Sequence, residues 1–72
     1  MADTVNEIDA IKVRTGLFAF ITARLEDAHE VAVKGQAAKI SNQDVGDLIV
    51  NLRSMLDEIK IQMDAIDLLR DL

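Results

Sequence analysis

Apolar side chains recur every three or four positions through two long stretches of the chain, which is the spacing of helices with one buried side. The first stretch covers about residues 4–34 and the second about residues 41–71. The chain has no proline, and strand-favouring aromatic residues are nearly missing, with only two phenylalanines. The pattern predicts one all-α domain over residues 1–72, in which two long helices and a connection at about residues 35–40 form an antiparallel hairpin.

Local signals mark the ends of the first predicted helix. Thr4 and Glu7 match the S/T-x-x-E pattern of a capping box, in which each side chain accepts a hydrogen bond from the backbone amide of the other residue. Gly35 lies where a glycine in the left-handed conformation commonly ends a helix. Folding the chain about residue 38 then places Phe18 opposite residues 56–59, and predicts it to be the most deeply placed side chain of the assembly.

The start of the second predicted helix carries two signals. Ser41 is the expected N-cap, and Asp44 lies three residues later as the acidic partner of a capping box. Ile40 and Val45 flank this box at the two positions that form a hydrophobic staple. Both signals predict that the connection ends at about residue 40.

The apolar arcs of the two predicted helices differ in width. In the second helix the arc spans roughly 120° on a helical wheel and contains Val45, Leu48, Ile49, Leu52, Met55, Leu56, Ile59, Met63 and Ile66. In the first helix it spans about 180° and contains Ala10, Ile11, Val13, Leu17, Phe18, Phe20, Ile21, Leu25, Ala28, Val31 and Ala32. A helix that is apolar over half its circumference needs more than one neighbour, and a hairpin supplies only one.

This surplus of apolar surface predicts self-association. An isolated hairpin would expose a larger apolar patch than monomeric proteins usually tolerate, whereas two hairpins can bury it in an antiparallel four-helix bundle. We therefore expect a homodimer or a higher homo-oligomer. The residues expected to carry self-association are Leu17, Phe18, Ile21, Leu25, Leu48, Leu52, Leu56 and Ile59.

Charge and composition narrow the range of partners. The net charge of −5 would repel a polyanion at long range, which argues against a nucleic-acid partner. The longest apolar run covers residues 16–23, far short of the roughly 20 residues that span a bilayer. The N-terminal residues lack the basic and apolar regions of a signal peptide, and the chain has no cysteine; both features fit a cytoplasmic protein.

Two arginines, Arg14 and Arg24, lie within the apolar arc of the first predicted helix. They are candidate contacts for an anionic ligand or an acidic partner. Alternatively, their alkyl chains cover apolar surface while each guanidinium reaches a carboxylate, with Glu7 as one candidate for Arg14. The second interpretation is favoured because no glycine-rich loop or helix N-terminus lies beside them in the sequence.

The only candidate metal motif is Glu26-x-x-His29, the spacing used by di-iron four-helix bundles. Such a site also needs inward-facing carboxylates from the other helix, and the acidic residues of the second helix fall outside its apolar arc. Glu26 itself lies on the polar side of the first helix. We therefore expect no metal and no cofactor, and place His29 at the edge of the apolar arc.

The remaining side of the second predicted helix is charged. Acidic residues alternate there with basic ones at spacings of three, four and seven, which is typical of a solvated face laced with salt bridges. These residues are Arg53, Asp57, Lys60, Asp64, Asp67 and Asp71. Val50, Ile61 and Leu68 also lie outside the apolar arc, and we interpret them as scattered surface residues.

No pattern in the chain indicates catalysis. With one histidine, no cysteine and no phosphate-binding loop, it lacks the usual parts of nucleophilic and nucleotide-dependent enzymes. The leading hypothesis is a small non-enzymatic, homo-oligomeric helical protein that presents a surface to a protein partner. One alternative is a nucleic-acid-binding regulator with ROP-like hairpin-dimer geometry. Another is an enzyme or ligand binder with a site at a subunit interface around Arg14 and Arg24.

Overall fold

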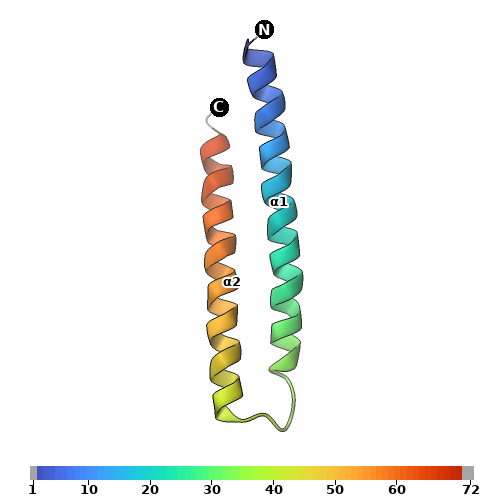
Figure 1. Ribbon diagram of the computed structural model, residues 1–72, viewed down its shortest axis with the longest axis vertical. Helices are drawn as coiled ribbons and strands as arrows, with labels where there is room; N and C mark the ends of the chain where they lie inside the picture. The colour runs from blue at the N-terminus through green and yellow to red at the C-terminus, as the bar shows by residue number, and fades with distance from the viewer. Residues whose placement is uncertain (1, 71–72) are drawn as a thin grey trace.

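Two antiparallel helices lie side by side in the computed structural model, α1 over Ala2–Lys34 and α2 over Asn42–Leu69 (Figure 1). The structure describes the backbone of residues 2–70 and the side chains of residues 9–70, and residues 2–70 contain no strand. The hairpin measures 61 × 15 × 11 Å. The predicted all-α helical hairpin is therefore confirmed. Neither helix, over the part described, has a stretch long and apolar enough to cross a membrane.

Ser41 caps α2 as predicted. Its backbone is extended, and its Oγ accepts a hydrogen bond of 3.0 Å from the amide of Asp44. The amide of Val45 donates to the carbonyl of Ser41 at 3.0 Å and closes the first helical turn. The Asp44 carboxylate lies in this first turn, where the helix dipole favours a negative charge. The start of α2 is thus fixed by residues next to one another in the sequence.

The predicted last residue of α1, Lys34, is confirmed, but the predicted start of the helix and the way it closes need correction. The helix begins at Ala2, so Thr4 lies within it rather than ahead of it; the side chains of Thr4 and Glu7 lie outside the described residues. No glycine has a positive φ, so the prediction of a left-handed Gly35 is wrong. The last turn tightens instead, with the Gly35 amide donating to the Ala32 carbonyl at 3.1 Å. Bonds to the carbonyl three residues back satisfy helix ends as a left-handed glycine would.

The residues shielded between the helices form one seam. Those of α2 alternate at spacings of three and four residues through the whole helix, and are Val45, Leu48, Leu52, Met55, Ile59, Gln62, Ile66 and Leu69. Those of α1 opposite α2 are Leu17, Ile21, Arg24, Ala28 and Val31. This is the packing of an antiparallel coiled coil. Among residues 9–70, only Ile21, Val31 and Ile59 are buried, at 9%, 8% and 6% exposure, so this part of the hairpin has a very small core of its own.

An ion pair between Arg24 and Glu58 shows the register of the two helices. Gly35 lies close to Leu48, which agrees with this register. Gly35 comes eleven residues after Arg24, and Leu48 comes ten residues before Glu58. A fold about residue 38 would put Arg24 opposite residue 52, so α2 is displaced by six residues, or about 9 Å at 1.5 Å per residue. The predicted placement of Phe18 opposite residues 56–59 is therefore wrong. The reason is the connection, which drops beyond the end of α1 before α2 begins (Figure 1).

The two helices do not end together at the other end of the hairpin. Leu69, the last residue of α2, lies eleven residues beyond Glu58 and is therefore level with Val13 of α1. The N-terminal part of α1 extends past the end of α2 (Figure 1). About three turns of α1 therefore have no neighbouring helix within the hairpin.

Candidate self-association surface

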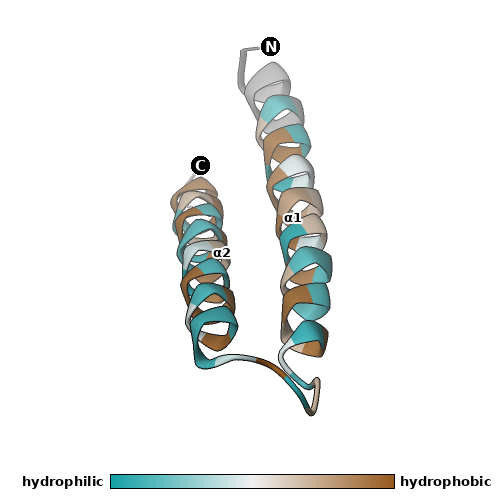
Figure 2. Ribbon diagram, turned by 60° about the horizontal axis from the view of Figure 1, so that its bottom comes forward, coloured by the Kyte–Doolittle hydropathy of each residue, from teal (hydrophilic) through white to brown (hydrophobic). Residues whose placement is uncertain are grey.

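A row of exposed apolar side chains runs beside the seam on each helix. Each row repeats every seven residues, which keeps it parallel to the seam of a coiled coil. The row on α1 consists of Ile11, Phe18, Leu25 and Ala32, and the row on α2 consists of Ile49, Leu56 and Met63. We call these seven residues the apolar face. Hydrophobic and hydrophilic residues alternate along both helices and do not form separate blocks (Figure 2).

Both rows lie on the same side of the hairpin. Each member of a row that lies opposite the other helix comes one residue after a seam position, so it is rotated from the seam by about 100° in the direction of the right-handed helix. Because the two helices run antiparallel, this rotation brings both rows to the same side of the hairpin. The register puts the rows at matching heights. Phe18 lies six residues before Arg24 and Met63 five after Glu58, so these two side chains are nearly level. By the same count Leu25 is level with Leu56, and Ala32 with Ile49.

The apolar face is open to solvent. Phe18, Leu25 and Leu56 are 52%, 53% and 56% exposed, and Ile11, Ile49 and Met63 are exposed to a similar degree. Burial instead extends to the opposite side of the seam, where Glu58 and Ala65 of α2 are half-buried. The opposite side is therefore better shielded along α2, although Val13 and Phe20 of α1 are exposed there at 51% and 41%.

The eight residues predicted to carry self-association divide between these two regions. Phe18, Leu25 and Leu56 lie on the apolar face. The other five lie in the seam within the hairpin and are Leu17, Ile21, Leu48, Leu52 and Ile59. The sequence reasoning missed Ile11, Ala32, Ile49 and Met63 as members of one surface. Their seven-residue repeat was visible in the sequence, but the common side requires the register of α1 against α2.

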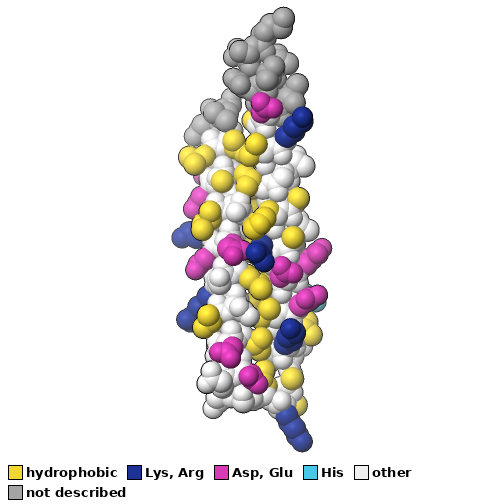
Figure 3. Space-filling view, viewed as in Figure 1, with side chains coloured by type: hydrophobic (Ala, Val, Ile, Leu, Met, Phe, Trp, Pro, Cys, Tyr) yellow, Lys and Arg dark blue, Asp and Glu magenta, His cyan; other side chains and the backbone are white. Residues whose placement is uncertain are grey.

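The opposite side of the seam carries a charged cluster around Arg24. The Arg24 guanidinium lies against the Glu58 carboxylate and 3.1 Å from Asp27 Oδ2, and its Cζ lies 5.4 Å from the centre of the Phe20 ring. Glu58 Oε2 is shielded from solvent and makes no well-directed hydrogen bond, so the Arg24 charge alone compensates it. Figure 3 shows this side, where acidic and basic side chains interrupt the line of hydrophobic ones between the helices. Arg24 thus stabilises the hairpin across its seam.

Arg14 is exposed and belongs to no ion pair among residues 9–70. Glu7, its candidate partner, has a side chain outside the described residues. Arg14 and Arg24 both lie on α1, ten residues or about 15 Å apart along the helix at 1.5 Å per residue. They therefore do not converge on one anion.

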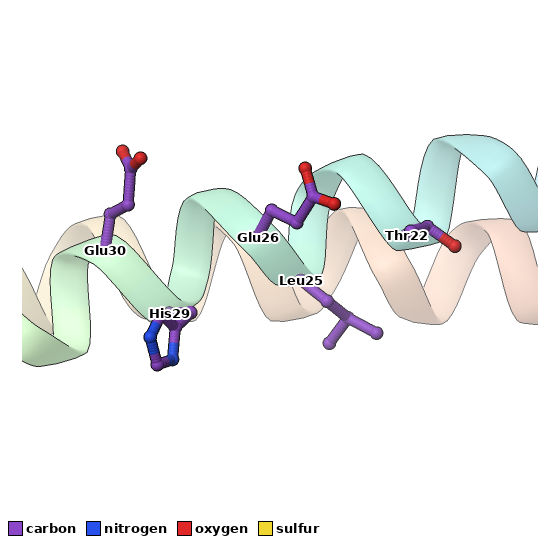
Figure 4. A pocket seen from close by; sticks show the side chains of 5 residues that line it. All are labelled: Thr22, Leu25, Glu26, His29 and Glu30. Carbon is purple, nitrogen blue, oxygen red and sulfur yellow. The ribbon is translucent and has the colours of Figure 1, made fainter.

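The Glu26-x-x-His29 motif lies on the outer surface of α1. His29 and Leu25 point to one side of the helix, whereas Glu26 and Glu30 point to the other (Figure 4). These residues and Thr22 line a shallow, open depression that α2 does not enter. No three histidine or acidic side chains within residues 9–70 are grouped to hold a metal ion. His29 instead borders the apolar face beside Leu25.

The outer side of α2 departs from the salt-bridge-laced surface that the sequence predicts. Four of its charged residues, Arg53, Asp57, Lys60 and Asp64, form a row next to the apolar face, which we call the charged row. The spacings allow intrahelical pairs, yet the only ion pair that the structure describes within α2 and its C-cap joins Asp67 to Arg70 at 2.9 Å. The charged row is therefore available for other partners.

The other apolar residues of α2 do not form a surface. Val50, Ile61 and Leu68 are exposed, but they are separated by eleven and seven residues and lie away from the apolar face.

Compared with protein families, with curated proteins and with solved structures, the chain gives no match.

Proposed function

We propose that this chain is a small, non-enzymatic interaction protein that self-associates through the apolar face. The observation that carries the proposal is the set of large side chains in that face that remain about half exposed on one side of the hairpin. Monomeric proteins rarely expose a contiguous apolar patch of this kind. A second hairpin placed on the face would give each helix the second neighbour that it lacks, as in a four-helix bundle.

Two features support a role in binding rather than in catalysis. The charged side chains that contact one another, Arg24, Asp27 and Glu58, form ion pairs within the hairpin, and the pair of Arg24 with Glu58 joins α1 to α2. The depression near His29 is lined by one helix only and is open to solvent, whereas catalytic sites usually enclose their substrate in a concave pocket.

The acidic balance of the chain supports a protein partner rather than a nucleic acid. At a net charge of −5 per chain, self-association would add to the negative charge of the assembly. A nucleic-acid regulator of hairpin-dimer geometry would need a basic face. Salt-sensitive binding to RNA or DNA would favour that alternative.

Sedimentation equilibrium at micromolar concentration tests the proposal. We expect a mass at least twice the 8.0 kDa of the chain. Leu56→Glu, which places a charge in the apolar face, should give a helical species of monomer mass. Ile61→Glu is the matched control, because Ile61 is exposed on α2 to a similar degree, 63% against 56% for Leu56, but lies off the face. A wild-type monomer, or loss of association in Ile61→Glu and not in Leu56→Glu, would show that the proposal is wrong.

A further inference from the structure

The charged row of α2 has a self-complementary arrangement. Its members Arg53, Asp57, Lys60 and Asp64 are separated by four, three and four residues, so their spacing reads the same in both directions. Their charges alternate, so reversing the row exchanges every positive position for a negative one. A copy of α2 laid antiparallel alongside therefore pairs every charge with its opposite, whereas a parallel copy at the same height would pair like with like.

From this arrangement we infer that a second copy of the chain docks on the apolar face with its α2 antiparallel to the first α2. The inference rests on the proposed self-association and specifies its geometry. A two-fold axis passes at the height midway between Asp57 and Lys60. Arg53 then faces Asp64 of the partner copy and Asp57 faces Lys60, and the symmetry makes each pair occur twice.

The apolar row of α1 fits the same axis. In the register shown by Arg24 and Glu58, the axis crosses α1 between Ala23 and Arg24. Rotation about this axis places the partner's Leu25 level with residue 22 of the first copy. That position lies three residues before Leu25 and four residues after Phe18 of the first copy. All four apolar positions of the row interleave with those of the partner at spacings of three and four residues. These are the spacings at which side chains interdigitate between packed helices.

The overhang of α1 supports this antiparallel arrangement. Ile11 lies beyond the end of α2 and is half exposed. About the proposed axis, the partner copy brings the C-terminal end of its own α1 beside Ile11. A dimer with both connections at one end would place α2 of the partner beside α1. Because the partner's α2 also ends level with Val13, it would not reach Ile11. Only the arrangement with connections at opposite ends covers the overhang.

The charged row provides a test by exchange of charge. Arg53→Glu/Lys60→Glu makes the row entirely negative, and Asp57→Lys/Asp64→Lys makes it entirely positive. Each variant alone should bind itself at least about tenfold more weakly than the wild type, because four attractive surface pairs become repulsive. An equimolar mixture should form a heterodimer. Lys34→Glu, which changes charge on the side away from the apolar face, should leave the dissociation constant within about twofold of wild type.

Spin labels measure the orientation directly, since the chain contains no native cysteine. Gln43 lies fifteen to sixteen residues from the axis, or about 23 Å at 1.5 Å per residue, so labels on Gln43→Cys should be at least about 45 Å apart. With both connections at one end, the labels would lie within about 30 Å, given helix spacings of 8–10 Å. Long distances and an obligate heterodimer support the inference. A wild-type dimer with short distances, or variants that do not select each other, overturns it and leaves the proposed self-association standing. A wild-type monomer overturns both.

Discussion

Phe18 and Phe20 form a natural matched pair for testing whether the apolar face is covered. They are the two aromatic residues of the chain and lie on opposite sides of the seam, at 52% and 41% exposure. In an isolated hairpin, truncating either to alanine would cost about half of the roughly 1.5–3 kcal/mol that full burial contributes. Phe20→Ala would cost about 0.5–1 kcal/mol more, because it also removes the contact with the Arg24 guanidinium.

Covering the apolar face reverses this order. Phe18 would become fully buried, and truncating a buried phenylalanine costs about 3–5 kcal/mol. That is as much as the whole core of so short a chain usually supplies, about 3–5 kcal/mol below 70–80 residues. We therefore expect Phe18→Ala to lose helical circular dichroism and oligomeric mass together at micromolar concentration, while Phe20→Ala keeps both.

Urea unfolding at two protein concentrations a hundredfold apart provides the assay. A dimer that unfolds to separated chains gains about 2.7 kcal/mol from the higher concentration by mass action, so its midpoint should rise, and that of an isolated hairpin should not. The reasoning is refuted if Phe18→Ala costs no more than Phe20→Ala and the wild-type midpoint is independent of concentration. The helices would then be stabilised without any contact on the apolar face.

Three further predictions concern the hairpin itself, and each is checked by the free energy of unfolding. Ser41→Ala should cost about 0.5–2 kcal/mol by removing the cap of α2 without changing the oligomeric mass, and no loss would contradict the observed hydrogen bond. Arg24→Leu should cost about 1–2 kcal/mol because Glu58 loses its partner at a partly shielded site, and Arg24→Leu/Glu58→Leu should recover most of it; additive losses would contradict the coupling. Gly16→Ala should stabilise the protein by up to about 1 kcal/mol, because an added Cβ meets no atom within 4 Å; a loss would indicate that this surface is packed in the assembly.

Local sequence determined the elements of this protein and two of their boundaries, the end of α1 and the start of α2. The three- and four-residue spacing identified most of the inner side of α2 without any knowledge of its neighbour. The predicted arc was too wide, however, since it also included Ile49, Leu56 and Met63, and it left out Gln62 and Leu69. Ser41 and Asp44 marked the start of α2 because a cap acts between residues three apart. The position of the end of α1 was predicted as well, but its geometry was not, since Gly35 can close a helix either in the left-handed conformation or by tightened bonds to earlier carbonyls, and both use the same residue.

The inner side of α1 could not be found in the same way. Its apolar residues cover about half the circumference, so several rows were equally able to face α2. The structure selects the row that includes Leu17, Ile21 and Val31, and it leaves Phe18 outside. Arg24 contributes to this choice, because its guanidinium reaches Glu58 only when α1 is turned and displaced as observed.

The tertiary structure alone therefore decided two things: the register of α2 against α1, and the side of the hairpin on which each exposed apolar row lies. The path of the connection displaces α2 by six residues from a symmetric fold, and no pattern within either helix contains that displacement. Register determines which side chains of α1 and α2 become level, and the antiparallel direction brings their outer apolar rows to one common side. Each row is a local property of one helix, but the apolar face exists only where the two helices meet, because a surface shared between them depends on their relative position.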